Sequence, residues 1–368
     1  MGLEYVGQYW HPKSRMVCLL GKGDDTVRDL TPYLPYPSAR RQVLDSCRGI
    51  SALWLLQESA PFPTVQAIME AEALRISLPE LLAPVWEKAL AVGGEIDEAA
   101  LAIAPDPEKS HLVACVIPLR AQAFGVTYEN SSLERTAEGQ KSDYGYVYRS
   151  VRERGERCEV FIKGTRLSHF FGPHAAMGLR TDLTNSLDEQ GRPKQRTDVL
   201  AGIEPELGAV TYSNGRILGY TLCNDGSGNQ IENESILYLY QAKYFVASMG
   251  SGPWLWLSDE QDNPGIRFSV CVRTDTGREV YAGEADSALI GLEIHKLVAQ
   301  AASHNPLYPG ELFSTGTNIV PGGEAKVLQP GWGVEIRSET LGSFIHSAAR
   351  VSADNNPNPD YHRLERGH

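Results

Sequence analysis

Three acidic residues stand at the ends of two strand-like runs. Glu204 and Glu206 flank Pro205 at the start of the first run, and Asp225 ends the second. Asn214-Gly215 lies between the runs, and this dipeptide is typical of a tight β-hairpin turn. A two-residue turn sets the register so that Glu204 faces Asp225. Because strand side chains alternate between faces, Glu206 lies on the same face and the three carboxylates converge.

Three carboxylates this close together repel one another, and their pKa values rise unless a positive charge lies between them. Oxygen ligands select a hard cation, so Mg²⁺ is expected, with Mn²⁺ or Ca²⁺ as alternatives. Three protein ligands leave coordination positions for substrate or water, as a catalytic site requires. The alternative at this point is a surface hairpin whose acids align without binding a metal.

The composition restricts the class of protein. Acidic residues outnumber basic ones by 46 to 34 in 368 residues, which gives a formal net charge of −12. An acidic surface opposes binding to nucleic acid phosphates. The apolar runs are far shorter than the roughly 20 residues of a membrane span. The N-terminus carries an acid and no apolar stretch, which argues against a secretory signal. We therefore expect a cytoplasmic protein with no nucleic acid or membrane partner.

The six cysteines are scattered along the chain, and no two form a Cys-x-x-Cys pair. This spacing argues against a zinc ribbon or a thioredoxin-type site. Scattered cysteines in an acidic chain are typical of reduced, buried thiols in the cytosol.

The elements that must position the acids change in character along the chain. Up to about residue 118, short strands mix with helices, and beyond it strands, turns and glycines predominate. The stretch 93–109, rich in small and acidic residues and in proline, is interpreted as a linker or loop. The expected elements are a strand at 17–20 followed by a turn at 21–25, helices at 39–59, 64–75 and 78–92, a strand at 268–273 and a helix at 284–303.

The change in composition near Pro105-Asp106-Pro107 predicts a boundary between two domains. We expect an N-terminal domain at 1–115, a catalytic domain at 116–352 and a flexible, Asn- and Pro-rich tail at 353–368.

The hairpin resembles the Glu-x-Glu…Asp metal signature of the fumarylacetoacetate hydrolase family. Four further segments resemble that family in the same order along the chain. They are Gly125-Val-Thr-Tyr128 with Glu134 (the first active-site loop), Phe161-Ile-Lys163 (a lysine-bearing strand), Leu237 to Lys243 with Gln241 (a substrate-facing segment) and Thr315-Gly316-Thr317 (a loop near the C-terminus).

The resemblance implies an α+β fold, a mixed β-sheet roll around a metal with a smaller N-terminal α/β domain. It also implies a homodimer and a small 2-oxo acid as substrate. The chemistry of the family includes C–C hydrolysis of acylpyruvates, decarboxylation or tautomerisation of 2-oxo acids, and dehydration of 2-keto-3-deoxy sugar acids.

The first loop favours one branch of the family. Hydrolases of the family usually carry a histidine three residues after the loop tyrosine, where this chain has Ser131. The pattern is similar to that of the 2-keto-3-deoxy-D-arabinonate dehydratase branch, as is the run from Glu232 to Lys243. Asn229 and Gln230 depart from the arginine and acid of that branch, which indicates an altered substrate.

The resemblance therefore implies a magnesium-dependent hydro-lyase that acts through a metal-stabilised enolate. The alternatives are an acylpyruvate-type C–C hydrolase, a 2-oxo acid decarboxylase or tautomerase, and an altered family member with a binding or biosynthetic role. The implied site residues are Lys243, Glu134 and Lys163 as catalytic groups, Tyr128, Ser131, Gln241, Gly316 and Thr317 as substrate-binding groups, and Glu204, Glu206 and Asp225 as metal ligands.

Overall fold

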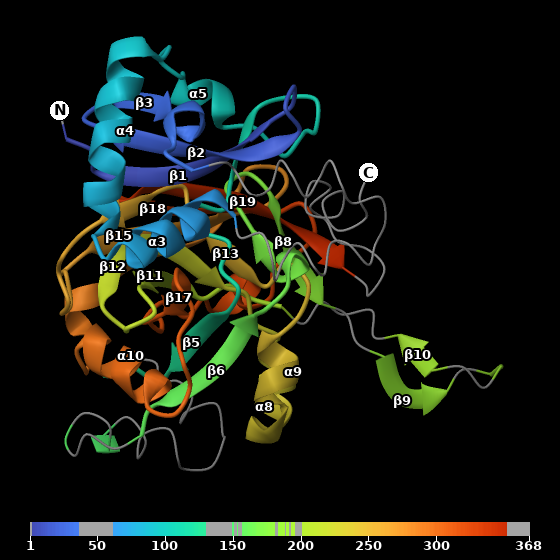
Figure 1. The fold of residues 1–368 in the computed structure, drawn as a ribbon. Coiled ribbons are helices and arrows are strands. Elements are labelled where there is room, and N and C mark those ends of the chain that lie inside the picture. Colours follow the sequence, from blue (N-terminus) through green and yellow to red (C-terminus); the bar gives the residue numbers. More distant parts are fainter. Residues whose placement is uncertain are drawn as a thin grey trace.

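Two large β-sheets, a two-stranded hairpin and a few helices form the described part of the computed structural model, which confirms the expected α+β class (Figure 1). Within the described part of the chain, no helix is long and apolar enough to cross a membrane. The expected helix at 39–59 and tail at 353–368 lie outside the described residues. The structure describes residues 2–36, 62–129, 149–150, 153, 157–180, 183–187, 189–190, 193–195 and 201–351.

The larger sheet contains twelve strands and carries the carboxylate hairpin. Nine strands follow one another across it, and β4 (His111–Val113), β13 (Met249–Ser251) and β7 (Phe170–Phe171) pair off this path. The order is β3 (Thr26–Asp29), β2 (Met16–Gly23), β1 (Tyr5–His11), β14 (Leu255–Leu257), β12 (Ile217–Asp225), β11 (Pro205–Thr211), β17 (Glu311–Ser314), β5 (Ala121–Gly125) and β6 (Glu159–Gly164).

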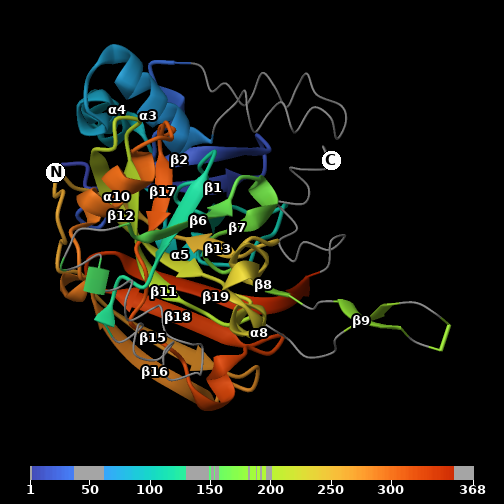
Figure 2. The ribbon, with the colours of Figure 1, turned by 90° about the horizontal axis from the view of Figure 1, so that it is seen from below.

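Five strands form a second sheet along one side of the body (Figure 2). A third sheet is a two-stranded hairpin, β9 (Leu183–Leu187) with β10 (Pro193–Gln195), which projects away from the body in Figure 1. The order of the five-stranded sheet is β16 (Glu279–Asp286), β15 (Arg267–Arg273), β18 (Gly333–Ser338), β19 (Gly342–Val351) and β8 (Ala176–Arg180).

Two of the helices predicted in the N-terminal part lie within the described residues. The helices α3 (Pro63–Leu74) and α4 (Leu78–Val92) confirm two of the predicted segments. A capping box, in which Ser77 and Glu80 bond each other's backbone N–H, fixes the start of α4. The remaining helices are α5 (Glu98–Leu101), α8 (Asn229–Glu234), α9 (Leu239–Lys243) and α10 (Ile294–Ala302), with 3₁₀ turns at Thr31–Tyr33, Leu167–His169, Ile236–Tyr238, Ser287–Leu289 and Gly323–Lys326.

Three sequence predictions need correction. The expected helix at 284–303 is wrong in its first half, because the chain remains in β16 as far as Asp286 and pairs with β15. The predicted strand at 17–20 is confirmed within β2, but the turn begins only at Asp24 because Lys22 and Gly23 still pair with β3. The stretch read as a linker contains the short helix α5, which Asp97 caps.

The hairpin of β11 and β12 reaches the predicted pairing by a different route. Its turn has three residues rather than two: Tyr212 N–H donates to Arg216 O, and Gly215 has a positive φ of 84°. The extra turn residue shifts the register by one, and a bulge at Leu218 shifts it back. Pro205 therefore pairs with Asn224. Beyond this pair, Asp225 N–H donates to Glu204 O, so Glu204 and Asp225 lie beside each other as predicted.

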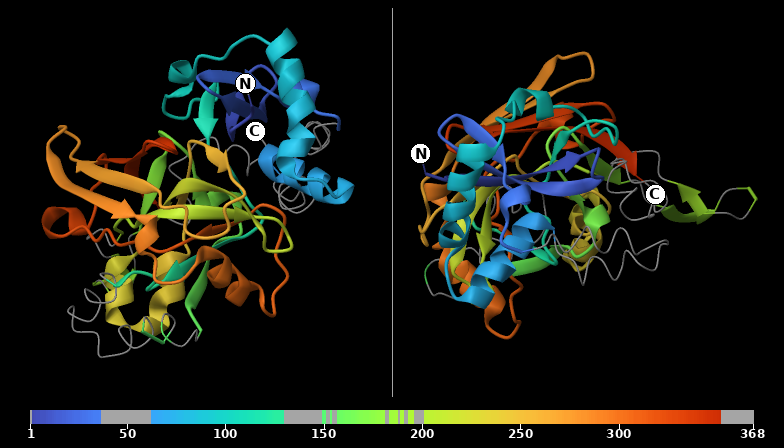
Figure 3. Two further views of the ribbon diagram at one scale, coloured as in Figure 1. Left: turned by 90° about the vertical axis from the view of Figure 1, so that its left-hand side faces the viewer. Right: turned by 45° about the horizontal axis from the view of Figure 1, so that its top comes forward.

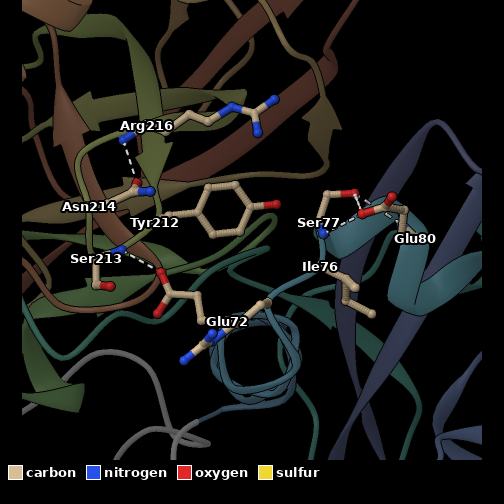
Figure 4. Close-up of a pocket in the computed structure, with 9 residues that line it drawn as sticks. Glu72, Ile76, Ser77, Glu80, Tyr212, Ser213, Asn214 and Arg216 are labelled. Carbon is tan, nitrogen blue, oxygen red and sulfur yellow. Dashed lines mark hydrogen bonds between the residues drawn. The ribbon is translucent and has the colours of Figure 1, made fainter.

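The turn of this hairpin packs against the junction of α3 and α4. Figure 4 shows Tyr212 pointing toward the start of α4, where its hydroxyl accepts the Leu78 N–H at 2.8 Å. Glu72 of α3 accepts the Ser213 N–H at 2.6 Å. A polar pocket of about 470 Å³ remains between the turn and the helices. The hairpin is thus held by the N-terminal part at its turn and carries its acids at the open end.

Strand pairing crosses the expected domain boundary. Tyr5 and Val6 of β1 pair with Trp256 and Leu255 of β14, so the N-terminal strands continue the large sheet. The N-terminal part, coloured blue and cyan, nevertheless lies at one end of the molecule in Figure 3. One hydrophobic core runs through both parts and includes Val6, Trp86, Leu222 and Phe344. The domain boundary near residue 115 stays a prediction. The two parts share a sheet and a hydrophobic core, so they are connected by more than the linker between them.

Candidate metal and active site

The open end of the hairpin brings the three predicted carboxylates together. Glu204, Glu206 and Asp225 each place a carboxylate oxygen within 4.8 Å of the other two. Glu206 and Asp225 are each 1% exposed, whereas the Glu204 side chain keeps 15% of its surface. The predicted convergence is therefore confirmed, and the cluster is most open at Glu204.

Burial and mutual repulsion perturb the two inner acids. Burial raises the pKa of Glu206 well above its usual range, and the neighbouring Asp225 and Glu204 carboxylates raise it further. Burial also raises the pKa of Asp225, although the ammonium groups of Lys163 and Lys243 oppose the rise. Such a cluster favours an additional positive charge among its oxygens.

The donor set fits a hard divalent cation. An octahedral Mg²⁺ at ~2.1 Å from each oxygen separates opposite ligands by ~4.2 Å, and Ca²⁺ at ~2.4 Å separates them by ~4.8 Å. The observed spacing of the three carboxylates is within reach of both ions. All three donors are oxygens, which are the ligands these ions prefer.

Lys163, on β6, is completely buried beside the cluster. Its Nζ lies 2.6 Å from Asp225 Oδ1 and donates to the backbone oxygens of Gly226 at 2.7 Å and Lys243 at 2.5 Å. Burial lowers the pKa of Lys163, and the contact with Asp225 opposes this effect. The ammonium group thus faces one carboxylate oxygen and two backbone oxygens. The geometry is that of a fixed counter-charge to Asp225.

Lys243, at the end of α9, is also buried but meets the cluster from its open side. Its Nζ donates to Glu204 Oε2 at 2.8 Å and to Ser227 Oγ at 2.6 Å. Asp225 Oδ2 lies 3.6 Å away and Glu232 Oε2 lies 4.0 Å away. Of the two predicted lysines, Lys243 is the one that touches the more exposed carboxylate.

Tyr128 lies just beyond the end of β5 and is 1% exposed. Its hydroxyl is buried without a hydrogen-bond partner among the described residues. Burial and the nearby Glu206 carboxylate raise its pKa, so the hydroxyl remains a proton donor. An unpaired buried hydroxyl beside the cluster is suited to contact a substrate oxygen.

The Thr-Gly-Thr loop after β17 packs directly against the ligand strand. Gly316 N–H donates to Glu206 Oε2 at 2.7 Å, and Thr317 Oγ1 donates to Pro205 O at 2.7 Å. Gly316 has a φ of 90°, and a Cβ there would lie 2.0 Å from Thr127 Oγ1, so only glycine fits. The loop therefore orients Glu206.

Gln241, another predicted substrate-binding residue, does not point into a buried site. Gln241 is exposed, and its backbone oxygen accepts a hydrogen bond from Arg180. The predicted substrate-binding Ser131 and the predicted catalytic Glu134 lie outside the described residues.

Sequence reasoning missed three residues that support the site. Ser227 Oγ accepts from Lys243 and donates to Asp225 O at 2.9 Å. Glu232 is 3% exposed and faces Lys243. Asn224 bonds the backbone of Glu204. Asn224 precedes Asp225 directly, and Ser227 follows it by two residues. Glu232 begins the run that resembles the dehydratase branch. These positions in the sequence could have indicated that the three residues belong to the site.

A protein-family model described as fumarylacetoacetate (FAA) hydrolase C-terminal matches residues 202–348. The matched span contains the carboxylate hairpin, Lys243 and the Thr-Gly-Thr loop.

Two curated proteins are similar to this chain over most of their length. The 2-dehydro-3-deoxy-D-arabinonate dehydratase of Saccharolobus solfataricus is 31% identical over 234 residues, which cover 62% of this chain and 71% of that protein. A probable 2-keto-3-deoxyxylonate dehydratase of Haloferax volcanii is 32% identical over 239 residues, which cover 64% of this chain and 75% of that protein.

Among solved structures, a 2-keto-3-deoxy-D-arabinonate dehydratase complexed with magnesium and 2,5-dioxopentanoate has the same fold. It superposes with a TM-score of 0.65 at 22% identity and covers 94% of this chain and 99% of its own. The expected type of sheet roll is thus confirmed.

Proposed function

This chain belongs to the fumarylacetoacetate hydrolase family, and on that premise we propose that it is a magnesium-dependent lyase that removes water from a 2-keto-3-deoxy sugar acid or a related 2-oxo acid. Both curated relatives are named as dehydratases of such acids. The observation that carries the proposal is the buried carboxylate cluster with Lys243 against its open side.

Glu204, Glu206 and Asp225 are the proposed ligands of the cation. When bound, a divalent cation supplies Lewis acidity that polarises the 2-keto group of the substrate and acidifies the protons on C3. Mg²⁺ is the proposed ion, and Mn²⁺ or Ca²⁺ would accept the same oxygen donors. Because Glu204 is the most exposed of the three, the substrate is proposed to approach from its side.

Lys243 is the proposed group for proton transfer at C3. Its Nζ is next to the open carboxylate, and Ser227 and Glu232 hold it there. Lys163 is proposed to keep Asp225 charged rather than to exchange protons, because its buried ammonium group already contacts Asp225 and donates to two backbone oxygens. A base that acts on the C3 proton needs to lie within hydrogen-bond reach of it.

The leaving hydroxyl on C4 needs a proton donor, and Glu134 is the proposed acid. Tyr128 is the proposed donor to a substrate oxygen, since its buried hydroxyl has no partner among the described residues. Gly316 and Thr317, which already donate to β11, are proposed to bind the substrate as well. Ser131 and Gln241 complete the proposed substrate-binding set.

A comparison of substrates tests the reaction class. The purified chain would be given a 2-keto-3-deoxypentonate and an acylpyruvate in parallel, each with Mg²⁺ and with EDTA. We expect faster loss of water from the sugar acid, and no turnover in EDTA. Faster acylpyruvate cleavage would replace the lyase by a C–C hydrolase. Turnover that survives EDTA would overturn the metal assignment.

We also propose a cytoplasmic homodimer with no nucleic acid or membrane partner. The net charge of −12 supports the absence of nucleic acid binding. All five described cysteines are free and four of them are buried, as in a reducing compartment. Light scattering coupled to gel filtration would test the dimer, and a monomeric mass would contradict it.

A further inference from the structure

Asn224, the residue before Asp225 on β12, is fully buried between the two sheets. Its Oδ1 accepts the backbone N–H of Glu204 at 3.1 Å. Its Nδ2 lies 3.0 Å from His346 Nε2 on β19 and 3.3 Å from Met177 Sδ on β8. The amide therefore links the open end of the carboxylate hairpin to two strands of the five-stranded sheet.

The backbone of Glu204 is bonded on both sides by residues of β12. Asp225 N–H donates to Glu204 O at 2.9 Å, whereas Glu204 N–H donates to the side chain of Asn224. The next residue is Pro205, which has no N–H. Asn224 thus supplies, through its side chain, a bond that orients the backbone of Glu204.

The amide of Asn224 can face only one way. A rotation by 180° would bring its NH₂ group against the Glu204 N–H, which places two donors together. In the observed orientation His346 Nε2 is an acceptor, so its proton is on Nδ1, 3.0 Å from Ser347 O. Burial lowers the pKa of His346 to about 4, in agreement with a neutral ring.

Aromatic side chains fix the His346 ring itself. Phe171 meets it edge-on, with ring centroids 5.0 Å apart, and the Phe344 ring lies at 5.3 Å. His346 is 2% exposed, so its ring has little freedom to turn away from Asn224. The fixed His346 ring and the Glu204 N–H therefore hold the amide of Asn224 from its two ends.

We propose that His346 and Asn224 are positioning residues that set the affinity of the carboxylate cluster for a divalent cation. His346 fixes the amide of Asn224, and Asn224 fixes the backbone from which the Glu204 carboxylate extends. The inference rests on the proposed function, because Glu204 must be a ligand for this positioning to affect binding. Residues that orient metal ligands typically change metal affinity by roughly 10–100-fold when replaced.

Calorimetric titration of the full chain with Mn²⁺ tests the proposal through His346→Gln and His346→Asn. Glutamine reaches the position of Nε2 and keeps an acceptor for Asn224, whereas asparagine is too short. We expect His346→Gln to bind Mn²⁺ as the unaltered chain does, and His346→Asn to bind about tenfold more weakly. Asn224→Ala should lose at least as much Mn²⁺ affinity. Adding His346→Asn to it should cause no further loss, because His346 acts through the amide that Asn224→Ala removes.

His111→Asn is the matched control, since His111 is a fully buried histidine on β4 in the N-terminal part. It should leave Mn²⁺ affinity unchanged even if the melting temperature falls. If the unaltered chain binds Mn²⁺, equal Mn²⁺ affinities of the two His346 variants would overturn the proposal. Additive losses of affinity in the double variant would overturn it as well. An unaltered chain that binds no Mn²⁺ would overturn the proposed function as well.

Discussion

Lys163 Nζ lies 2.6 Å from Asp225 Oδ1, and both side chains are at most 1% exposed. The ion pair joins β6, at one edge of the large sheet, to β12 near its middle. Two backbone oxygens complete the coordination of the ammonium group. Asp225 therefore has a buried ion-pair partner within the chain itself.

Lys163→Met should lower the free energy of unfolding by about 3–5 kcal/mol in EDTA, because it removes the nearer of the two lysines that face the buried Asp225 carboxylate. Urea denaturation measures the loss. Arg216→Met is the control: Arg216 also forms a 2.6 Å ion pair, with Asp259, but both side chains are exposed. Its loss should stay below about 1 kcal/mol. Equal losses would show that Lys163 is not a buried counter-charge.

Asp225→Asn should weaken Mn²⁺ binding, because it removes one of three ligand charges from the cluster. We expect a loss beyond the roughly 10–100-fold that replacement of an orienting residue causes. Calorimetric titration measures it, with Asp259→Asn as the same chemical change at an exposed position. An unchanged dissociation constant for Asp225→Asn would reject this residue as a ligand.

Lys243→Met should reduce the rate of dehydration by about 10²–10⁴-fold, the usual contribution of a positioned acid or base. Initial rates at saturating Mg²⁺ measure the effect, and Mn²⁺ titration checks that the cluster still binds metal. Lys296→Met removes an exposed lysine of α10 and should keep full activity. A Lys243 variant that retains most of its rate would show that another group moves the proton.

His169 should make the folded state sensitive to acid. Burial lowers its pKa to about 3, while its Nδ1 accepts the N–H groups of Thr165 and Arg166. The unfolded chain binds a proton near the ordinary value of 6.5, so stability is full above that pH and falls as the pH drops toward 3. From pH 7 to pH 5 this amounts to about 2 kcal/mol.

Urea denaturation at both pH values would compare the unaltered chain with His169→Gln, which should lose less stability on acidification. His304→Gln, at an exposed position, should behave as the unaltered chain does. The same acid sensitivity in all three proteins would show that His169 is not the cause.

The sequence predicted the site better than the architecture around it. Alternation and the Asn-Gly turn placed Glu204 opposite Asp225, because strand geometry depends only on local spacing. The turn length was nevertheless wrong, and the pairing is correct because a bulge at Leu218 offsets the extra turn residue. No local pattern announces such a compensation, since it depends on the strands that flank the hairpin.

The helix expected at 284–303 shows the opposite case. Its apolar positions allowed a helical reading, but pairing with β15 holds Glu284 and Ala285 in a strand. The contribution of β1 to the large sheet was equally invisible, because its partner β14 lies about 250 residues further along the chain. The link between Asn224 and His346 joins residues 122 positions apart. Contacts between residues far apart in the sequence determine these features, and the periodicity of apolar residues does not reveal them.

The pairing of β1 with β14 bears on how the chain can be dissected. A fragment that begins near residue 116 would lack β1 and β4, and β14 would become the edge of the large sheet. Leu255, which is completely buried in the whole chain, would meet solvent beside a row of unpaired N–H and C=O groups. Such an edge recruits strands from other molecules. We therefore expect a fragment from about residue 116 onward to aggregate when it is expressed alone, because β1 covers the edge of β14.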